Sequence, residues 1–179
     1  GNTLTRYVLF IGYSTFVNRT GINENEFRFN GDFDFPLGEL TLRLGTALHH
    51  ASVNNLSSDM PRLFAFQTRQ QTLVQVNPSL VRQAGNFNLK MGLRFGAGFD
   101  DMEDNFFLSP DVVANLTIAE GVISLEGGIT GEIKPSTYRG IMEENPFVSP
   151  DIHVKTAFHG VKFFTGVKGN FSSMTSFAA

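Results

Sequence analysis

The chain has 179 residues, enough for one domain with a sizeable interior, and it carries a net charge of −3. Positive and negative residues are interspersed, which excludes the basic surface of a nucleic-acid-binding protein. Cysteine is absent, so disulfides, thiolate metal sites and cysteine nucleophiles are excluded. No run of about 18 apolar residues occurs, which excludes a membrane-spanning helix but not membrane-spanning strands of about 10 alternating residues.

The composition favours β-structure along the whole chain. There are 19 phenylalanines and 18 glycines against no tryptophan, and scattered aromatic residues and glycines are typical of strands with bends or bulges. Residues 4–16 form the first expected strand. The next, residues 26–35, reads EFRFNGDFDF and alternates phenylalanine with charged or polar residues. Side chains alternate between the two faces of a strand, so this segment has one apolar face and one polar face.

The same period of two recurs in later segments. Residues 40–48 and 87–95 place leucine, methionine and phenylalanine on one face, opposite arginine, lysine, asparagine and glycine. A short helical turn is expected near residues 78–83. Less regular segments rich in β-branched and aromatic residues are further expected strands: residues 62–76, 112–118, 122–133, 152–158 and 161–171.

The connections between these strands are expected to alternate between tight turns and long loops. Short glycine-bearing turns are expected at residues 36–39, 83–86, 119–121 and 158–160, and long polar loops at residues 50–61, 98–105 and 134–146. This asymmetry is typical of an up-and-down outer-membrane barrel. The sequence therefore predicts a single all-β domain over residues 1–179, an antiparallel meander of about eight to ten strands forming an outer-membrane-type β-barrel or a partial barrel.

An internal repeat supports a hairpin unit. NFFLSPDV at residues 105–112 recurs as NPFVSPDI at residues 145–152, and NPSL at residue 77 is a weaker copy. The prolines at positions 110 and 150 would suit the start of a strand, where a missing N–H is tolerated. A chance recurrence of a common turn triplet is the other explanation.

The polar faces of the expected strands supply the candidate functional residues. In a membrane barrel the apolar faces would contact lipid and the polar faces would line the lumen. The candidates for lumen-facing residues are Arg28, Asp32, Asp34, Arg43, Lys90, Arg94, Glu126 and Glu132.

Two other classes of protein stay open at this point. A soluble β-barrel or clam would turn the same phenylalanines inward to bind a hydrophobic ligand, with the charged residues outside. An adhesin or a structural repeat protein is the other class, and only the internal repeat supports it. The aromatic composition is an argument against a membrane barrel. Such barrels carry rings of tyrosine and tryptophan at the membrane interfaces, and this chain has three tyrosines and no tryptophan.

No catalytic constellation is found, so an enzyme is not expected, and no cofactor is expected. The acidic segment 100–104 offers Asp100, Asp101 and Asp104 as weak candidates for a calcium site, with a solvated loop as the other interpretation. His49 and His50 are adjacent, so on a strand they cannot point to the same face and bind one metal ion.

The second half of the chain resembles the barrel region of TonB-dependent receptor-type outer-membrane proteins. The resemblance rests on an apolar-SPD motif, on tight turns before strands of the form xxxxGxxG at residues 122–131 and 161–169, on TYRGIMEENPFVSP and on GVKGNFSS, within residues 107–177. It implies a β-barrel segment in the bacterial outer membrane, with membrane lipid as a partner and uptake of a nutrient as the function.

The resemblance has two departures that shape the expectation. Receptors of this kind resemble a long barrel filled by an N-terminal plug domain, and this chain carries no recognisable plug and too few strands. We therefore expect a fragment of a longer chain, whose other regions would contact TonB-type energy-coupling machinery. Such a fragment could also form a homo-oligomer or a soluble sheet.

Overall fold

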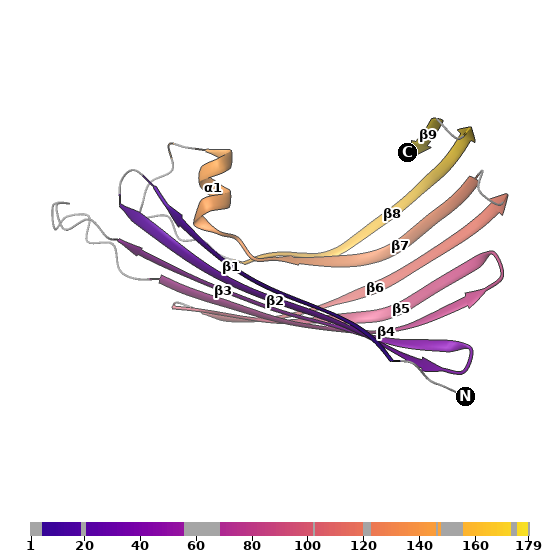
Figure 1. The fold of residues 1–179 in the computed structure, drawn as a ribbon, viewed down its shortest axis with the longest axis horizontal. Coiled ribbons are helices and arrows are strands. Elements are labelled where there is room, and N and C mark those ends of the chain that lie inside the picture. The colour runs from indigo at the N-terminus through magenta and orange to yellow at the C-terminus, as the bar shows by residue number, and fades with distance from the viewer. Residues whose placement is uncertain are drawn as a thin grey trace.

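In the part of the chain that the structure describes, a single antiparallel sheet of nine strands forms the framework (Figure 1). The structure, a computed structural model, describes residues 5–18, 21–55, 69–101, 103–119, 123–145, 147, 156–172 and 175–178. The strands are β1 (Arg6–Val17), β2 (Ile22–Leu37), β3 (Leu40–Asn55), β4 (Arg69–Ala84), β5 (Phe87–Asp100), β6 (Asp104–Ala119), β7 (Ile123–Lys134), β8 (Ala157–Ser172) and β9 (Thr175–Ala178), with one short helix, α1 (Tyr138–Glu144).

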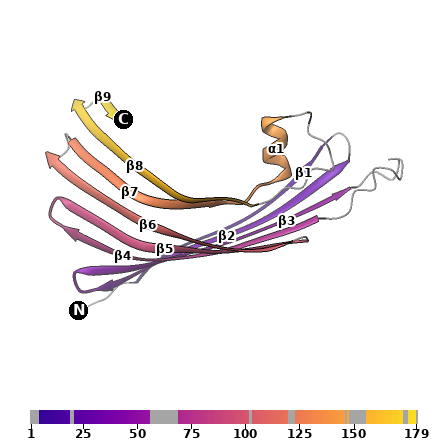
Figure 2. The same ribbon diagram turned by 180° about the vertical axis from the view of Figure 1, so that it is seen from behind.

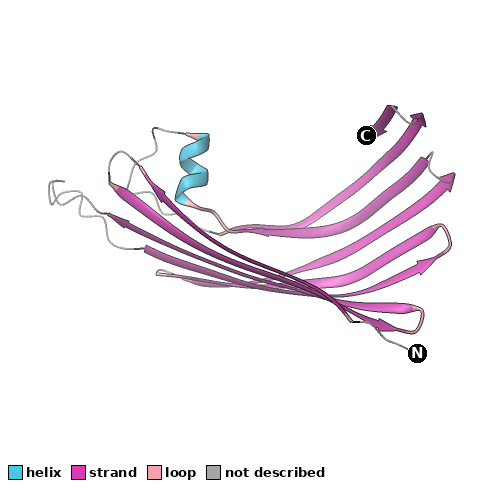
Figure 3. Ribbon diagram, in the orientation of Figure 1, coloured by secondary structure: helices cyan, strands magenta, loops and turns pink. Residues whose placement is uncertain are grey.

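Each strand pairs with its neighbours in sequence, in the order β1 to β9. The prediction of an all-β antiparallel meander is therefore confirmed. The barrel is not closed, because among the described residues β1 pairs with β2 alone. Figures 1 and 2 show a curved, open sheet with α1 on its concave side, and Figure 3 shows how little of the described chain lies outside strands.

Two of the predicted tight turns are confirmed. Gly38 joins β2 to β3 with φ of 67°, and Gly85 joins β4 to β5 with φ of 57°. Backbone angles of this kind are costly for residues that have a Cβ atom, which explains why glycine stands at both turns. The turn predicted at residues 119–121 lies largely outside the described residues.

Several predictions about local structure are wrong. Residues 78–83 are not helical but lie inside β4, and residues 158–160 are not a turn but lie inside β8. Residues 138–144, predicted as loop, form α1, whose first turn is capped by Thr137 through a 3.0 Å hydrogen bond from the Gly140 N–H to its hydroxyl. The loop predicted over residues 98–105 is short, because β5 continues to Asp100 and β6 starts at Asp104.

The SPD motif does not mark the start of a strand. Pro110 lies in the middle of β6, opposite Leu93 of β5. Pro78 lies in the middle of β4, where it pairs with Leu44 of β3. The pairing of β4 with β5 is interrupted there, between Val76 and Ser79. A proline lacks the N–H that a strand with two neighbours would use on one side, and the local gap in the β4–β5 ladder reflects that loss. The second copy of the motif falls mostly outside the described residues.

The two faces of the sheet carry opposite kinds of side chain. The buried polar residues all lie on the concave face by their cross-strand register: Glu24, Glu26, His49, Gln71, Ser79, Ser109 and Asp111. Most large exposed hydrophobic residues lie on the convex face, among them Tyr7, Leu9, Ile11, Tyr13, Phe27, Val74, Val76, Met91, Leu93, Phe95, Phe106, Leu108, Leu125 and Phe163. Polar groups are therefore sheltered and apolar groups are uncovered, the reverse of an ordinary soluble domain.

We expect Gly38→Ala to lower the free energy of unfolding by about 1 kcal/mol, because alanine pays for a left-handed backbone that glycine adopts freely. Urea unfolding followed by circular dichroism would measure the loss. The matched control is Gly127→Ala in β7, where the backbone is extended and the added Cβ atom would meet only the Phe164 carbonyl oxygen at 3.7 Å. An equal loss at both positions would contradict this account of the turn.

Candidate functional site

The concave face gathers the candidate residues that the sequence placed on polar strand faces. Arg28, Asp32 and Asp34 of β2 lie on this face. The pairing of successive strands places four further candidates on the same face: Arg43, Lys90, Arg94 and Glu126. Glu132 lies beyond an irregularity in the pairing of β7 with β8, between Thr130 and Glu132, where simple alternation is interrupted.

Most of these charges are held in ion pairs with a neighbouring strand. Arg43 donates two hydrogen bonds to the Asp34 carboxylate, at 2.7 and 2.9 Å. Lys168 lies 2.5 Å from Glu126. Glu132 accepts from Lys134 at 2.9 Å and from Lys162 at 3.1 Å. The face therefore presents paired rather than free charges along these strands.

Asp111 is a member of this face that sequence reasoning missed. Its carboxylate is buried and lies 2.6 Å from the Lys90 ammonium and 3.4 Å from the Arg94 guanidinium. The signal that could have found it is the alternation of β6, because the sequence predicts the SPD motif at the entry to a strand and that strand over residues 112–118 only. One carboxylate thus balances two cations from β5.

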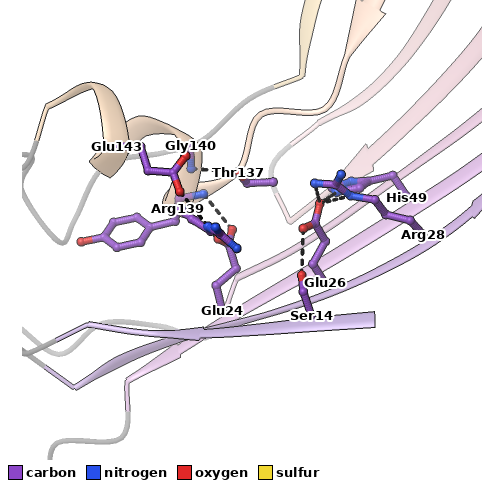
Figure 4. A network of polar contacts seen from close by, with 10 residues as sticks. Ser14, Glu24, Glu26, Arg28, His49, Thr137, Arg139, Gly140 and Glu143 are labelled. Atoms are coloured by element: carbon purple, nitrogen blue, oxygen red, sulfur yellow. Dashed lines mark hydrogen bonds and ion pairs between the residues drawn. The ribbon is translucent and has the colours of Figure 1, made fainter. Parts of the chain in front are cut away.

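A second polar cluster centres on Glu26 of β2 (Figure 4). Its Oε1 lies 2.5 Å from the His49 Nε2 and accepts from the Arg28 Nε at 2.6 Å, and its Oε2 accepts from the Ser14 hydroxyl at 3.2 Å. The side chain of His49 is almost fully buried. His50 points to the other face, where its Nδ1 lies 2.9 Å from the Thr72 hydroxyl, as alternation predicts.

Glu24, two residues before Glu26, anchors the helix to the sheet (Figure 4). Its two carboxylate oxygens accept the backbone N–H groups of Tyr138 at 2.7 Å and Arg139 at 2.8 Å, the first two residues of α1. These N–H groups have no partner within the helix, and a carboxylate at a helix N-terminus is favoured by the helix dipole. Sequence reasoning did not single out Glu24, because it pairs with a helix that was not predicted.

The helix also buries one aromatic side chain against the sheet. Tyr138 is 2 % exposed and packs with Ile22 and Val53, with Phe16 and Met142 beside them. Burial and the nearby Glu24 carboxylate raise the pKa of the Tyr138 hydroxyl above its usual range, because both disfavour the phenolate. One cluster of apolar contacts on the concave face thus lies under α1.

A small cavity lies near the start of the return strand β8. It has a volume of about 180 Å³ and is lined by Gln71, Gly98, Phe99, Asp100, Glu103, Asn105, Phe107 and Thr156. Asp100 is thus part of its wall, while the Asp101 carboxylate accepts the Gln70 N–H at 2.8 Å. Among the described residues, no group of three histidine or acidic side chains is placed to hold a metal ion, so Asp100, Asp101 and Asp104 do not form such a group.

Comparisons with known proteins give no family for this chain. No family model, no curated protein and no solved structure matches it. In the part of the chain that the structure describes, no helix is both long and apolar enough to cross a membrane. The functional argument therefore depends on the geometry of the two faces.

We expect Asp111→Ala to lower the free energy of unfolding by roughly 3 kcal/mol or more, because Lys90 and Arg94 would be left beside each other without their shared counter-charge. Urea unfolding would measure this loss. Asp34→Ala is the control, since its partner Arg43 is 44 % exposed, and there we expect at most about 1 kcal/mol. Losses of equal size would show that Asp111 is not the balancing charge.

We expect Tyr138 to ionise above the ordinary tyrosine pKa of about 10 and its docking to be pH-dependent. A raised pKa in the folded state means that the contribution to stability is complete below the unfolded pKa and is lost as pH rises through the folded pKa. An alkaline titration followed by tyrosinate absorbance should contain a late component that Tyr138→Phe removes. A titration curve of unchanged shape in that variant would contradict the burial of this hydroxyl.

Proposed function

We propose that this sheet is part of the wall of an outer-membrane receptor or transport barrel, with its convex face toward lipid and its concave face toward the lumen. The observation that carries the proposal is the reversed distribution of side chains. Phe106 and Phe163 are 80 % and 78 % exposed on the convex face, whereas Ser109 and Asp111 are 1 % and 4 % exposed on the concave face. Exposed phenylalanines on the convex face are favourable in contact with lipid, and polar residues on the concave face are suited to a water-filled lumen.

The dimensions of the strands support the same proposal. The strands β1 to β8 have 12 to 16 residues each. A tilted strand needs about 9–11 residues to cross the hydrocarbon region of a bilayer. Each of these strands is therefore long enough to cross and to project at one or both ends, while the hairpin turns at Gly38 and Gly85 lie together at the same end of the sheet (Figure 1).

The presence of α1 on the concave face supports a wide barrel. An eight-stranded barrel has an interior only just wide enough for its own side chains, whereas a helix with its side chains has a diameter of about 10–12 Å. We therefore assign these strands to one sector of a larger wall, completed by strands outside this sheet.

The direction of transport and its energy source are proposals that rest on the resemblance of residues 107–177 to TonB-dependent receptors. Under this proposal the protein belongs to the bacterial outer membrane, takes part in nutrient uptake, and depends on TonB-type coupling machinery that contacts other regions. The paired charges of the concave face, such as Arg43 with Asp34, would then line the route of the solute.

The alternative, a soluble clam around a hydrophobic ligand, is less well supported. It requires the apolar rows to face an enclosed interior. Leu42, Leu89, Met91 and Leu93 instead lie on the convex face, away from α1 and the polar clusters. The concave face, which would have to hold the ligand, carries Glu24, Glu26, His49 and Asp111.

We expect the purified chain to associate with phospholipid vesicles and Phe163→Lys to weaken this association. A lysine at the lipid-facing midplane of a barrel costs about 2–4 kcal/mol. Flotation of vesicles in a density gradient would measure the bound fraction. Asn30→Lys adds the same charge to an exposed position of the concave face and is expected to leave flotation unchanged. A chain that stays soluble and monomeric without lipid or detergent would contradict the proposed function.

A further inference from the structure

One segment of the chain leaves the wall of the sheet and crosses its concave face. It consists of residues 131–145, which include the end of β7 and α1, together with residues 156–160 at the start of β8; we call it the inward strap. Figures 1 and 2 both show β7 and β8 converging over the concave side before α1.

The contacts of the inward strap reach across five strands of the sheet. The Gly131 carbonyl accepts from the Arg94 guanidinium of β5 at 2.6 Å, and the Ile133 carbonyl accepts from the Gln75 amide of β4 at 3.3 Å. Phe158 packs on Phe107 of β6, with ring centroids 4.9 Å apart. At the far end α1 is held by β2 and β3 through Glu24, Ile22 and Val53.

The sheet is shaped to receive this segment. A Cβ atom at Gly131 would lie 2.2 Å from the Ser109 Cβ, and one at Gly96 would lie 2.6 Å from the Ile133 Cδ1. Only residues without a side chain permit this approach of the strap to the sheet. Ile133 is consequently buried, 6 % exposed, on the concave face. The strap is therefore packed against the concave face of the sheet.

The anchorage of the strap is uneven along its length. Near the sheet centre it is fixed by backbone carbonyls and by close packing over Gly96 and Ser109. Among the described contacts of α1 with the sheet, Glu24 is the charged group that holds the helix, through two hydrogen bonds. Loss of this one carboxylate removes both bonds while leaving the strands intact.

We propose that the inward strap is the size-limiting element of the passage through the barrel, and that Glu24 is the residue that positions it. The inference rests on the proposed function, because the strap narrows a passage only where the concave face encloses a lumen. In that setting a helix lying across the polar face removes cross-section from the route and leaves larger solutes excluded. Solute size is thereby selected by α1 and not by the wall.

The first experiment measures permeability of vesicles that contain the complete barrel of which these strands form one sector, with uncharged oligosaccharides of graded size as probes. Glu24→Ala is expected to raise the permeability to oligosaccharides above the wild-type size limit by roughly tenfold or more, because it removes two hydrogen bonds to a charged acceptor. Glu39→Ala, in the exposed turn at the end of β2, removes an equal charge and is the control. It is expected to leave the size limit unchanged.

The second experiment locks the strap in place. The natural chain has no cysteine, so Asn18→Cys with Met142→Cys creates a unique pair at positions whose side chains meet, with the Asn18 Nδ2 3.6 Å from the Met142 Sδ. Bridging this pair with a short bis-thiol reagent in the Glu24→Ala background is expected to restore the wild-type size limit. The unbridged variant provides the matched comparison.

The outcomes separate the two proposals. Failure of the wild-type chain to float with vesicles overturns the proposed function and with it the role of the strap. If flotation is normal but neither Glu24→Ala nor the bridge changes the size limit, the proposed role of the strap is wrong and the proposed function stands. The same holds if permeability stays absent in every variant. A raised limit in Glu24→Ala, lowered again by the bridge, supports the strap, provided that circular dichroism shows an intact sheet.

Discussion

Antiparallel register is the constraint on which the rest of the structure depends. Glu26 of β2 pairs with Ala51 of β3, and Ala51 pairs with Gln71 of β4, so these three side chains share a face. The register of each later pair of strands assigns its side chains to a face in the same way. A slip of one residue in any strand would carry its charges to the convex face and its apolar residues inward. The sharp turns at Gly38 and Gly85 hold that register at one end. The polar concave face is therefore a property of the whole sheet.

Contacts among its own polar groups stabilise the concave face. Glu26 meets His49, Arg28 and Ser14, Asp111 meets two cations, and Glu24 satisfies the first N–H groups of α1. Removing one partner from such a cluster costs more than the pair contributes, because the remaining charge stays sheltered without compensation. The convex face needs no such network, since its apolar residues require only an apolar surrounding.

The sequence predicted the sheet well and the inward strap poorly, for physical reasons. Alternation in segments such as residues 26–35 is a local signal, and it identified the strands and the shared face of Arg28, Asp34, Arg43 and Lys90. The helix gave no comparable signal, because a seven-residue helix held by Glu24 depends on a contact 114 positions away in the sequence. Pro78 and Pro110 led to wrong predictions of a helical turn and of the start of a strand. Proline is rare inside strands, yet both residues lie near the middle of one.

Some large apolar residues on the concave face remain exposed, and clear examples lie on β1 and β8. On β1, Val8 and Phe10 share the concave face yet are 52 % and 55 % exposed, and on β8 Phe164 shares that face and is 36 % exposed. Under the proposed function, lipid covers the convex face of these strands but not the concave face. Strands with apolar residues on both faces are typical of positions covered on both sides, and an unpaired edge in a membrane leaves backbone groups without partners. Under the proposed function, both arguments favour further structure beside β1 and beside the part of β8 that β9 does not pair with, and a wide barrel around α1 would need the same.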